Sequence, residues 1–357
     1  MKQHLNTLLT GLVVGAAAII LTWLGNPPNM GFCIACFIRD ISGSLGFHRA
    51  AAVQYLRPEV AGLGIGALII ALVKGEHRVR GGANPVLRFV LGFVMMVGAL
   101  IFLGCPLRMT LRLAAGDLNA LVGLGGFIAG IFVGIIALKS GFNSGRSYPQ
   151  LPGTGAIMPV VLVALMVALV TKPAFIFFSE TGPGSLTAPI LIALGFGLLV
   201  GILAQRSRLC MAGGIRDIIL IKDPHLLYGF IGIFAAALVG SLATGTFKFG
   251  FEGQPIAHTM HLWNFVGMTI VGWAAVLAGG CPLRQLIMAG QGDSDALVSV
   301  IGMGAGAAVA HNFGLAGSGA GVAVNGQWAG VIALVILAAI AFGHKLNLAP
   351  AALKKAA

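Results

Sequence analysis

Gly104-Cys105-Pro106-Leu107-Arg108 recurs without change as Gly280-Cys281-Pro282-Leu283-Arg284. A second motif, Cys33-Ile34-Ala35-Cys36-Phe37-Ile38-Arg39-Asp40-Ile41, aligns without gaps to Cys210-Met211-Ala212-Gly213-Gly214-Ile215-Arg216-Asp217-Ile218, with six identities in nine positions. The first cysteine precedes the second by 72 residues in one half of the chain and by 71 in the other. An ordered set of matches at one offset of 176 to 177 residues indicates an internal repeat.

The composition around these motifs is that of a membrane protein. The chain has 357 residues, of which 58% are hydrophobic and only 9% are charged. A soluble domain of this size cannot bury that much apolar surface. The 54 glycines suit close helix packing and interrupted helices. The net charge of +12 comes without any Lys/Arg run that has interleaved aromatic residues, which argues against nucleic-acid binding.

The hydropathy pattern predicts an all-α integral membrane protein with ten spanning helices and short re-entrant helices between them. Each span is long enough to cross about 30 Å of hydrocarbon. The segments between the spans that are too short and too polar to cross are typical of re-entrant pieces, and they lie at 31–47, 105–116, 206–222 and 281–292. The spans are expected near 7–25, 58–74, 86–104, 118–138, 155–171, 187–205, 226–247, 262–279, 296–315 and 327–343.

The repeat divides the membrane domain into two five-helix halves, 1–172 and 173–357. Because five is odd, the second half enters the membrane upside down, which is the inverted-repeat plan of many transporters. The side that carries the termini holds 15 of the 22 Lys and Arg residues, or 13 against 5 when the four motif arginines are set aside. We therefore expect both termini in the cytoplasm. Cys33 and Cys105 should then face outside, and Cys210 and Cys281 inside.

Each Gly-Cys-Pro-Leu-Arg motif suits a helix that begins at a break. Glycine permits a sharp turn, proline suits the first helical position, and the cysteine then lies at the N-cap. The N–H groups and the helix dipole favour an anion there, and the arginine three residues on offers a planar donor fork. The alternative is a tight packing turn with an inert cysteine. We expect a substrate path lined by Cys33, Cys105, Cys210, Cys281, Arg39, Arg108, Arg216 and Arg284.

The aspartates of the second motif are accessory candidates. Asp40 and Asp217 each follow an arginine, and we expect them to pair with arginines because a charge inside a membrane is costly unless it is paired. Such pairs could also act as a structural clamp between the halves. Asp117 and Asp293 each follow a glycine near a helix start, where an aspartate is typical of an N-cap.

Cys36, His48 and His225 are further accessory candidates. Cys36 forms a Cys-x-x-Cys pair with Cys33, which fits either a redox pair on the oxidising side of the membrane or a packing thiol. His48 and His225 each stand 15 residues after the first cysteine of their half. We expect no metal site and no cofactor, because no second Cys-x-x-Cys occurs and no histidine stands three or four residues from a cysteine.

The paired Gly-Cys-Pro-Leu-Arg segments and the Arg-Leu-Cys-Met-Ala-Gly-Gly run at 208–214 resemble the YeeE/YedE family of sulfur-transport membrane proteins over nearly the whole chain. The family contains thiosulfate importers whose cysteines line a central path. The resemblance implies that Cys33, Cys105, Cys210 and Cys281 are relay thiols. The stretch 33–46 is more similar to the YedE branch of selenium transporters, and the extra Cys36 departs from a plan of two thiols per half, so the cargo stays open between thiosulfate and a selenium species.

The function expected from these features is an inner-membrane importer, not an enzyme, of a small anionic or thiol-reactive sulfur or selenium species. Its partners would be the lipid bilayer, the substrate and a cytoplasmic sulfur or selenium carrier protein. One alternative is a membrane thiol–disulfide redox relay, in which the thiols of each tier approach within disulfide distance, whereas a transport relay would space them singly. Another is a structural protein that tethers the carrier. No G-x-x-x-x-G-K-[ST] loop for ATP is present.

Overall fold

The computed structural model describes residues 2–343, which form helices joined by loops and one very short pair of strands. The long helices are α1 (Lys2–Trp23), α3 (Pro58–Val73), α4 (Pro85–Phe102), α6 (Leu118–Lys139), α7 (Pro152–Thr171), α8 (Ile190–Ser207), α10 (Leu227–Ala243), α11 (His261–Leu277), α13 (Ser294–Asn312) and α14 (Val324–Phe342). The short helices are α2 (Ile34–Ser44), α5 (Pro106–Ala114), α9 (Met211–Ile221) and α12 (Pro282–Gly290). The strands β1 (Arg80–Gly81) and β2 (Tyr148–Pro149) pair antiparallel.

The all-α membrane fold is confirmed. Among residues 2–343, eight helical segments are long and apolar enough to cross a membrane, and three of them include a short helix after a break, at 85–114, 190–221 and 261–290. The apolar helices α3 and α10 are shorter, with 16 and 17 residues. The count of ten spans stays a prediction. The first helix begins at Lys2 rather than near Thr7, because the ring of His4 packs against those of His225 and Tyr228.

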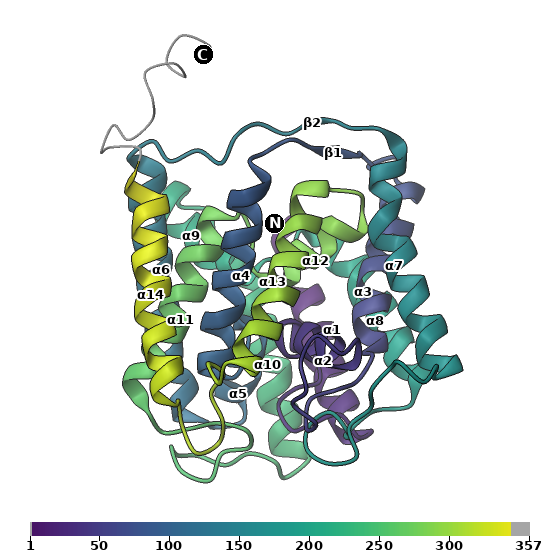
Figure 1. Cartoon of the computed structure of the whole chain (residues 1–357), viewed down its shortest axis with the longest axis vertical. Coiled ribbons are helices and arrows are strands. Elements are labelled where there is room, and N and C mark those ends of the chain that lie inside the picture. The colour runs from purple at the N-terminus through teal and green to yellow at the C-terminus, as the bar shows by residue number, and fades with distance from the viewer. Residues whose placement is uncertain (1, 344–357) are drawn as a thin grey trace.

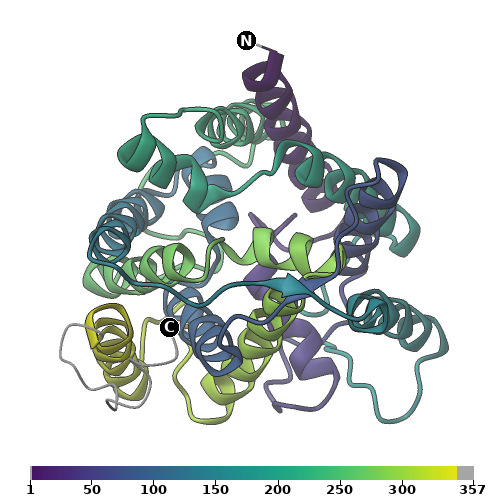
Figure 2. The same ribbon diagram turned by 90° about the horizontal axis from the view of Figure 1, so that it is seen from above.

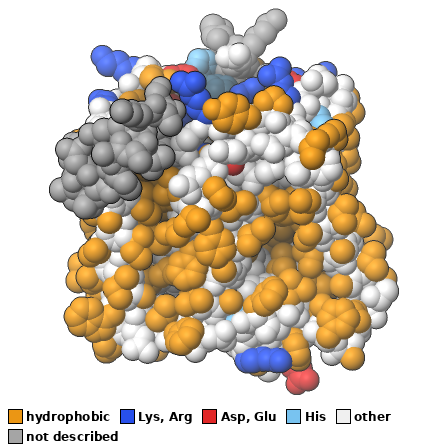
Figure 3. Space-filling view, turned by 45° about the horizontal axis from the view of Figure 1, so that its top comes forward, with side chains coloured by type: hydrophobic (Ala, Val, Ile, Leu, Met, Phe, Trp, Pro, Cys, Tyr) orange, Lys and Arg blue, Asp and Glu red, His pale blue; other side chains and the backbone are white. Residues whose placement is uncertain are grey.

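The long helices stand side by side (Figure 1). The C-terminal end of α14 lies near the face that carries β1 and β2, at the top of Figure 1, and α1 begins in the upper part of the same view. The three C-terminal lysines counted for the sidedness prediction lie outside the described residues. Apolar side chains cover the sides of the molecule in Figure 3, and Lys and Arg gather at its upper rim. Exposed large residues such as Leu191, Val239 and Val335 belong to this apolar surface. A belt of this extent on a helical protein is suited to contact with lipid.

The closest helix pairs connect the two halves of the chain. Helix α1 packs on α10 and α3 packs on α8, while α4 packs on α13 and α6 packs on α11. Alignment on the repeated cysteines makes α1, α3, α4 and α6 equivalent to α8, α10, α11 and α13. The contact of α1 with α10 is therefore equivalent to that of α8 with α3, and the contact of α4 with α13 to that of α11 with α6. Helix α14 is peripheral, as Figure 2 shows from above, and it packs on α11, α4 and α6. The long helices thus interlock across the halves and surround the short helices.

Local signals explain where the breaks occur. Helix α4 ends at Leu103 in a left-handed conformation with φ of 66°, and Gly279, with φ of 78°, separates α11 from α12. Pro106 and Pro282 then occupy the first helical positions of α5 and α12. The predicted aspartate caps are confirmed, since Asp117 accepts from the backbone N–H of Asn119 at 2.9 Å and Asp293 from that of Ala296 at 3.0 Å.

Glycine permits the close contact between α6 and α11. A Cβ atom added at Gly126 would lie 2.1 Å from the carbonyl oxygen of Phe265, whereas one at Gly125 would meet only the Phe265 ring edge at 3.8 Å. The first position therefore excludes any side chain, and the neighbouring position on the same helix accepts one.

We expect Gly126→Ala to destabilise the protein by roughly 1 to 3 kcal/mol, because the added methyl forces the two backbones apart. Gly125→Ala is the matched control, and alanine's better helix propensity should leave it as stable as the wild type or slightly more stable. The measurement is the thermal unfolding midpoint in detergent. Equal midpoints for the two variants would contradict the close backbone contact.

Candidate functional site

All four motif cysteines lie at helix N-caps, as predicted for Cys105 and Cys281 and found also for Cys33 and Cys210. Cys33 caps α2 and its sulfur accepts from the backbone N–H of Cys36 at 3.4 Å, while Cys210 caps α9 and accepts from that of Gly213 at 3.3 Å. Cys105 and Cys281 are the N-cap residues of α5 and α12. Each cysteine therefore lies where a helix presents N–H groups that have no partner in their own helix.

The helix starts meet in pairs. The thiol of Cys105 faces the backbone N–H groups of Ile34 and Ala35, the first residues of α2, and it is in hydrogen-bonding contact with the thiol of Cys33. In the second half, the thiol of Cys281 faces the backbone of Met211, the first residue of α9. Each thiol pair is thus surrounded by the N–H groups of two helices, which converge from different parts of the chain.

The thiols are paired and reduced. Cys210 Sγ lies 3.8 Å from Cys281 Sγ, which is hydrogen-bonding contact and not a disulfide bond. All five cysteines are buried. The thiols of each half are paired and not spaced singly, which is the arrangement expected of a redox relay, because convergence of the two helix starts brings both N-cap residues of a half together.

The two pairs occupy different levels of the molecule. Helices α2 and α5 lie in the lower part of Figure 1, and α9 and α12 lie in its upper part. We call Cys33 with Cys105 the lower thiol pair and Cys210 with Cys281 the upper thiol pair. The thiols of each half of the sequence therefore form one tier.

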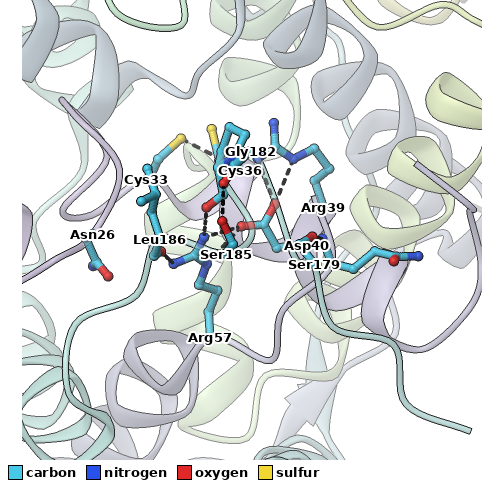
Figure 4. A network of polar contacts seen from close by, with 12 residues as sticks. Asn26, Cys33, Cys36, Arg39, Asp40, Arg57, Ser179, Gly182, Ser185 and Leu186 are labelled. Carbon is cyan, nitrogen blue, oxygen red and sulfur yellow. Dashed lines mark hydrogen bonds and ion pairs between the residues drawn. The ribbon is translucent and has the colours of Figure 1, made fainter. Parts of the chain in front are cut away.

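Buried ion pairs surround the lower thiol pair (Figure 4). Arg39 and Arg57 hold the two oxygens of Asp40, at 2.7 and 2.8 Å, and all three side chains are almost completely buried. The expected pairing of Asp40 is confirmed, but its second partner, Arg57, was not predicted. Arg57 stands directly before Pro58 at the start of a span, where an arginine is typical of an interface anchor.

The arginine of the first Gly-Cys-Pro-Leu-Arg motif is occupied by backbone carbonyls. Arg108 donates to the carbonyl oxygens of Leu103 and of Ile256, the second at 3.1 Å. Its guanidinium thus stabilises the end of α4, and each terminal nitrogen uses one of its two N–H groups for a backbone carbonyl. Only Nε, which is buried, lacks a protein partner among the described residues.

A further buried arginine, Arg112, also escaped prediction. It bonds to Asp117 at 2.6 Å and to the carbonyl of Phe102 at 2.9 Å, and lies 4.3 Å above the Phe102 ring centroid. Asp117 thus both caps α6 and pairs with Arg112. The spacing of five residues between Arg112 and Asp117 was the only signal in the sequence.

The charged side chains around the upper thiol pair are more exposed than those around the lower thiol pair. Arg216 pairs with Asp217 at 2.7 Å, as expected, but these side chains are 27% and 15% exposed, whereas Asp40 is fully buried. Arg284 donates to the amide oxygen of Gln205 at 3.1 Å. Gln205 was missed because a glutamine near the end of a span carries no motif. The two halves therefore surround equivalent thiols with different polar groups.

The remaining accessory candidates divide into two groups. Cys36 is buried beside Cys33 and adds a third thiol to the lower tier. His48 hydrogen-bonds to the carbonyl of Arg39 at 3.0 Å and its ring stacks on that of His311, so it connects α2 with α13. His225 instead contacts Thr7, which lies in the first half of the chain. Among residues 2–343, no group of three His, Cys, Asp or Glu side chains is arranged to hold a metal ion.

We expect Asp40→Asn to be strongly destabilising, by about 3 to 5 kcal/mol, because it leaves two buried arginines without a counter-charge. The matched control is Asp217→Asn, which removes the equivalent carboxylate at a partly exposed pair and should cost about 1 kcal/mol or less. Membrane abundance and the thermal midpoint in detergent measure both changes. Similar losses for the two variants would show that Asp40 is not the key counter-charge of the lower tier.

Comparison with known proteins places these features in a family. Residues 206–329, which contain the upper thiol pair, match the family described as sulphur transport. A thiosulfate transporter of Escherichia coli strain K12 is 32% identical over 111 residues, covering 29% of this chain and 29% of the relative. A thiosulfate transporter of Spirochaeta thermophila is 31% identical over 111 residues, covering 31% of this chain and 33% of the relative. The alignments thus span about a third of the length of these curated relatives.

The matched region carries the second copy of both cysteine motifs, and the first copy repeats them in the other half. The predicted resemblance is confirmed, while the selenium branch is not. Residues 206–329 are therefore similar to the sulphur-transport family, and the likeness to the thiosulfate transporters extends over about a third of the chain.

Proposed function

We propose that this protein imports a small sulfur anion of the thiosulfate class through the inner membrane, past the lower and then the upper thiol pair. The observation that carries the proposal is the pairing of N-cap thiols at two convergent helix starts in each tier. The names of the relatives, which are thiosulfate transporters, support a sulfur anion as cargo.

The chemistry of the tiers suits an anion with one soft end. Thiosulfate has three oxygens that accept N–H hydrogen bonds and a terminal sulfur that accepts a weak S–H bond. Convergent helix N-termini supply N–H groups and partial positive charge, and the thiols supply S–H donors. Each tier thus offers both kinds of contact without a metal or a covalent step.

The buried charges favour an anion without binding it directly. Around the lower tier lie four buried arginines, Arg39, Arg57, Arg108 and Arg112, against Asp40, Asp117 and Glu59. Each of these arginines donates to carboxylates or carbonyls of the protein, although Arg108 Nε and Arg112 Nη2 have no partner among the described residues. In a medium of low dielectric their excess positive charge acts over several ångströms. The arginines therefore act as a fixed field in this proposal, not as the donor forks expected from the motif.

The orientation follows from the repeat. The exchanged helix contacts support two inverted five-helix halves, 1–172 and 173–357, and the excess of Lys and Arg on the side of the termini supports their cytoplasmic location. The lower thiol pair then faces outside. A cytoplasmic sulfur carrier protein would take the anion on the other face, beside Arg216 and Arg284.

A thiol–disulfide redox relay is the second candidate, because Cys210 Sγ lies only 3.8 Å from Cys281 Sγ. In that function the two thiols of a tier become a disulfide and give up two electrons and two protons to an oxidant. Transport needs no such change. The two candidates differ in whether uptake depends on the oxidation state of the thiols.

We expect Cys281→Ser to reduce uptake of ³⁵S-thiosulfate at least about tenfold, which corresponds to about 1.4 kcal/mol of barrier. The serine hydroxyl lacks the polarisable S–H group of cysteine but can still occupy the N-cap position of α12. Cys36→Ser, at the thiol with no counterpart in the second half, is the control and should keep most of the activity. The assay uses cells or proteoliposomes at equal protein abundance, with labelled selenite as a second cargo.

Uptake by Cys281→Ser at the wild-type rate would contradict the thiol path. Absence of both labels above vector-only cells would remove the cargo assignment. Proteoliposomes held in excess reductant separate the two candidates, because transport continues there and a disulfide relay stops.

A further inference from the structure

A pocket of about 430 Å³ opens at the lower face, between the ends of α1 and α7 and the start of α8. Its wall is the segment that joins the two halves of the chain. Apolar residues of the three helices line one side. The other side carries an ammonium group and four hydroxyls, which belong to Lys172, Tyr55, Ser179, Ser185 and Thr187.

Lys172 is the one charged residue among those that line the pocket. It is exposed, and its ammonium lies 5.8 Å from the ring centroid of Phe178, which is also in the wall. Among residues 2–343, the lower side of the molecule has seven Lys and Arg residues, and the four around the lower tier are buried. Within this part of the chain, Lys172 is therefore one of three Lys and Arg residues that this face exposes, with Arg49 and Lys248.

Ser185 Oγ donates to the carbonyl of Gly182 at 2.9 Å, but the other hydroxyls keep protons that can be donated toward the same space. Ser179 Oγ accepts from the backbone N–H of Gln54 at 2.8 Å, and a hydroxyl that accepts still has its own proton to donate. Tyr55 and Thr187 bond to each other, which leaves one O–H of the two. Pro189 and Ile190, at the start of the 18-residue helix α8, also line the pocket, and no side chain caps this helix. Its first N–H groups are therefore further donors, while the carbonyl ends of α1 and α7 at the same pocket oppose its dipole.

The pocket wall is tied to the lower tier. Arg57 donates to the carbonyls of Leu186 and Pro183, at 3.0 and 2.9 Å, and its third bond goes to Asp40 of α2. Cys33 is the N-cap residue of helix α2 (Figure 4). One arginine thus connects the wall of the pocket with the helix that carries the lower thiols.

We propose that this pocket is a capture site for a tetrahedral oxyanion, in which Lys172 and the neighbouring hydroxyls hold the sulfur anion before it reaches Cys33 and Cys105. The proposal deepens the transport function and rests on it for the identity of the cargo. A lipid phosphate has the same chemistry as a ligand, since it is also tetrahedral and anionic. The pocket is assigned to the soluble anion because the hydroxyls of Ser179, Ser185 and Thr187 belong to the loop between α7 and α8 and not to a helix surface facing lipid.

The first test measures binding without transport. Purified protein in phosphatidylcholine nanodiscs is treated with an uncharged amine-acetylating reagent, and acetylation of Lys172 and Lys248 is followed by mass spectrometry. We expect thiosulfate, and sulfate more weakly, to slow the reaction several-fold at Lys172 and not at Lys248. Absence of protection, equal protection of both lysines, or protection by phosphatidylglycerol but not by thiosulfate overturns the proposal.

The second test measures uptake. Lys172→Gln should raise KM for thiosulfate several-fold and leave kcat unchanged, because it weakens capture and not the passage between tiers. Lys172→Arg should be close to the wild type. Lys248→Gln removes an equal charge from the same face outside the pocket and should have no effect. An unchanged KM in Lys172→Gln, or an equal change in Lys248→Gln, overturns the capture site.

The two proposals fail in different ways. If the wild type takes up no thiosulfate, the transport function is wrong, and the acetylation experiment still decides whether the pocket binds an oxyanion.

Discussion

Every backbone N–H inside a membrane needs a partner within the protein, because hydrocarbon offers none. A helix that starts at this depth exposes several N–H groups at once. Here the starts of α2 and α5 meet, as do those of α9 and α12, and cysteine sulfur accepts from the exposed groups. A thiol is a weak acceptor, so these sites are stable enough to fold and remain suited to a stronger acceptor such as an anion.

The same constraint accounts for the buried arginines. A guanidinium has five N–H donors and is always charged, so its burial requires several acceptors. Arg57 meets this need with Asp40 and two carbonyls. Arg112 pairs with Asp117 and the Phe102 carbonyl, while its Nη2 has no partner among the described residues. These bonds fix the arginines against the backbone at the helix breaks.

The two tiers are built on one motif but differ in their surroundings. The lower tier is enclosed by fully buried ion pairs and carries the extra thiol of Cys36, while Arg216 and Asp217 beside the upper tier are partly exposed. The segment between the halves closes over the lower tier through Arg57, and the described residues provide no equivalent arginine over the upper tier. The two halves thus surround equivalent thiols with polar groups of different exposure.

The sequence by itself determined the membrane class, the positions of most helices and the N-caps at Cys105 and Cys281. These features depend on hydropathy over about 20 residues and on local turn chemistry at glycine and proline, which short segments contain in full. Only the tertiary structure decided that Cys210 meets Cys281, that Arg57 shares Asp40 with Arg39, and that Arg108 faces carbonyls. These contacts join side chains far apart in the chain, and an arginine in a motif looks the same in sequence whether it faces a ligand or the backbone. Which it faces depends on how two broken helices converge, and that is a property of packing between the halves.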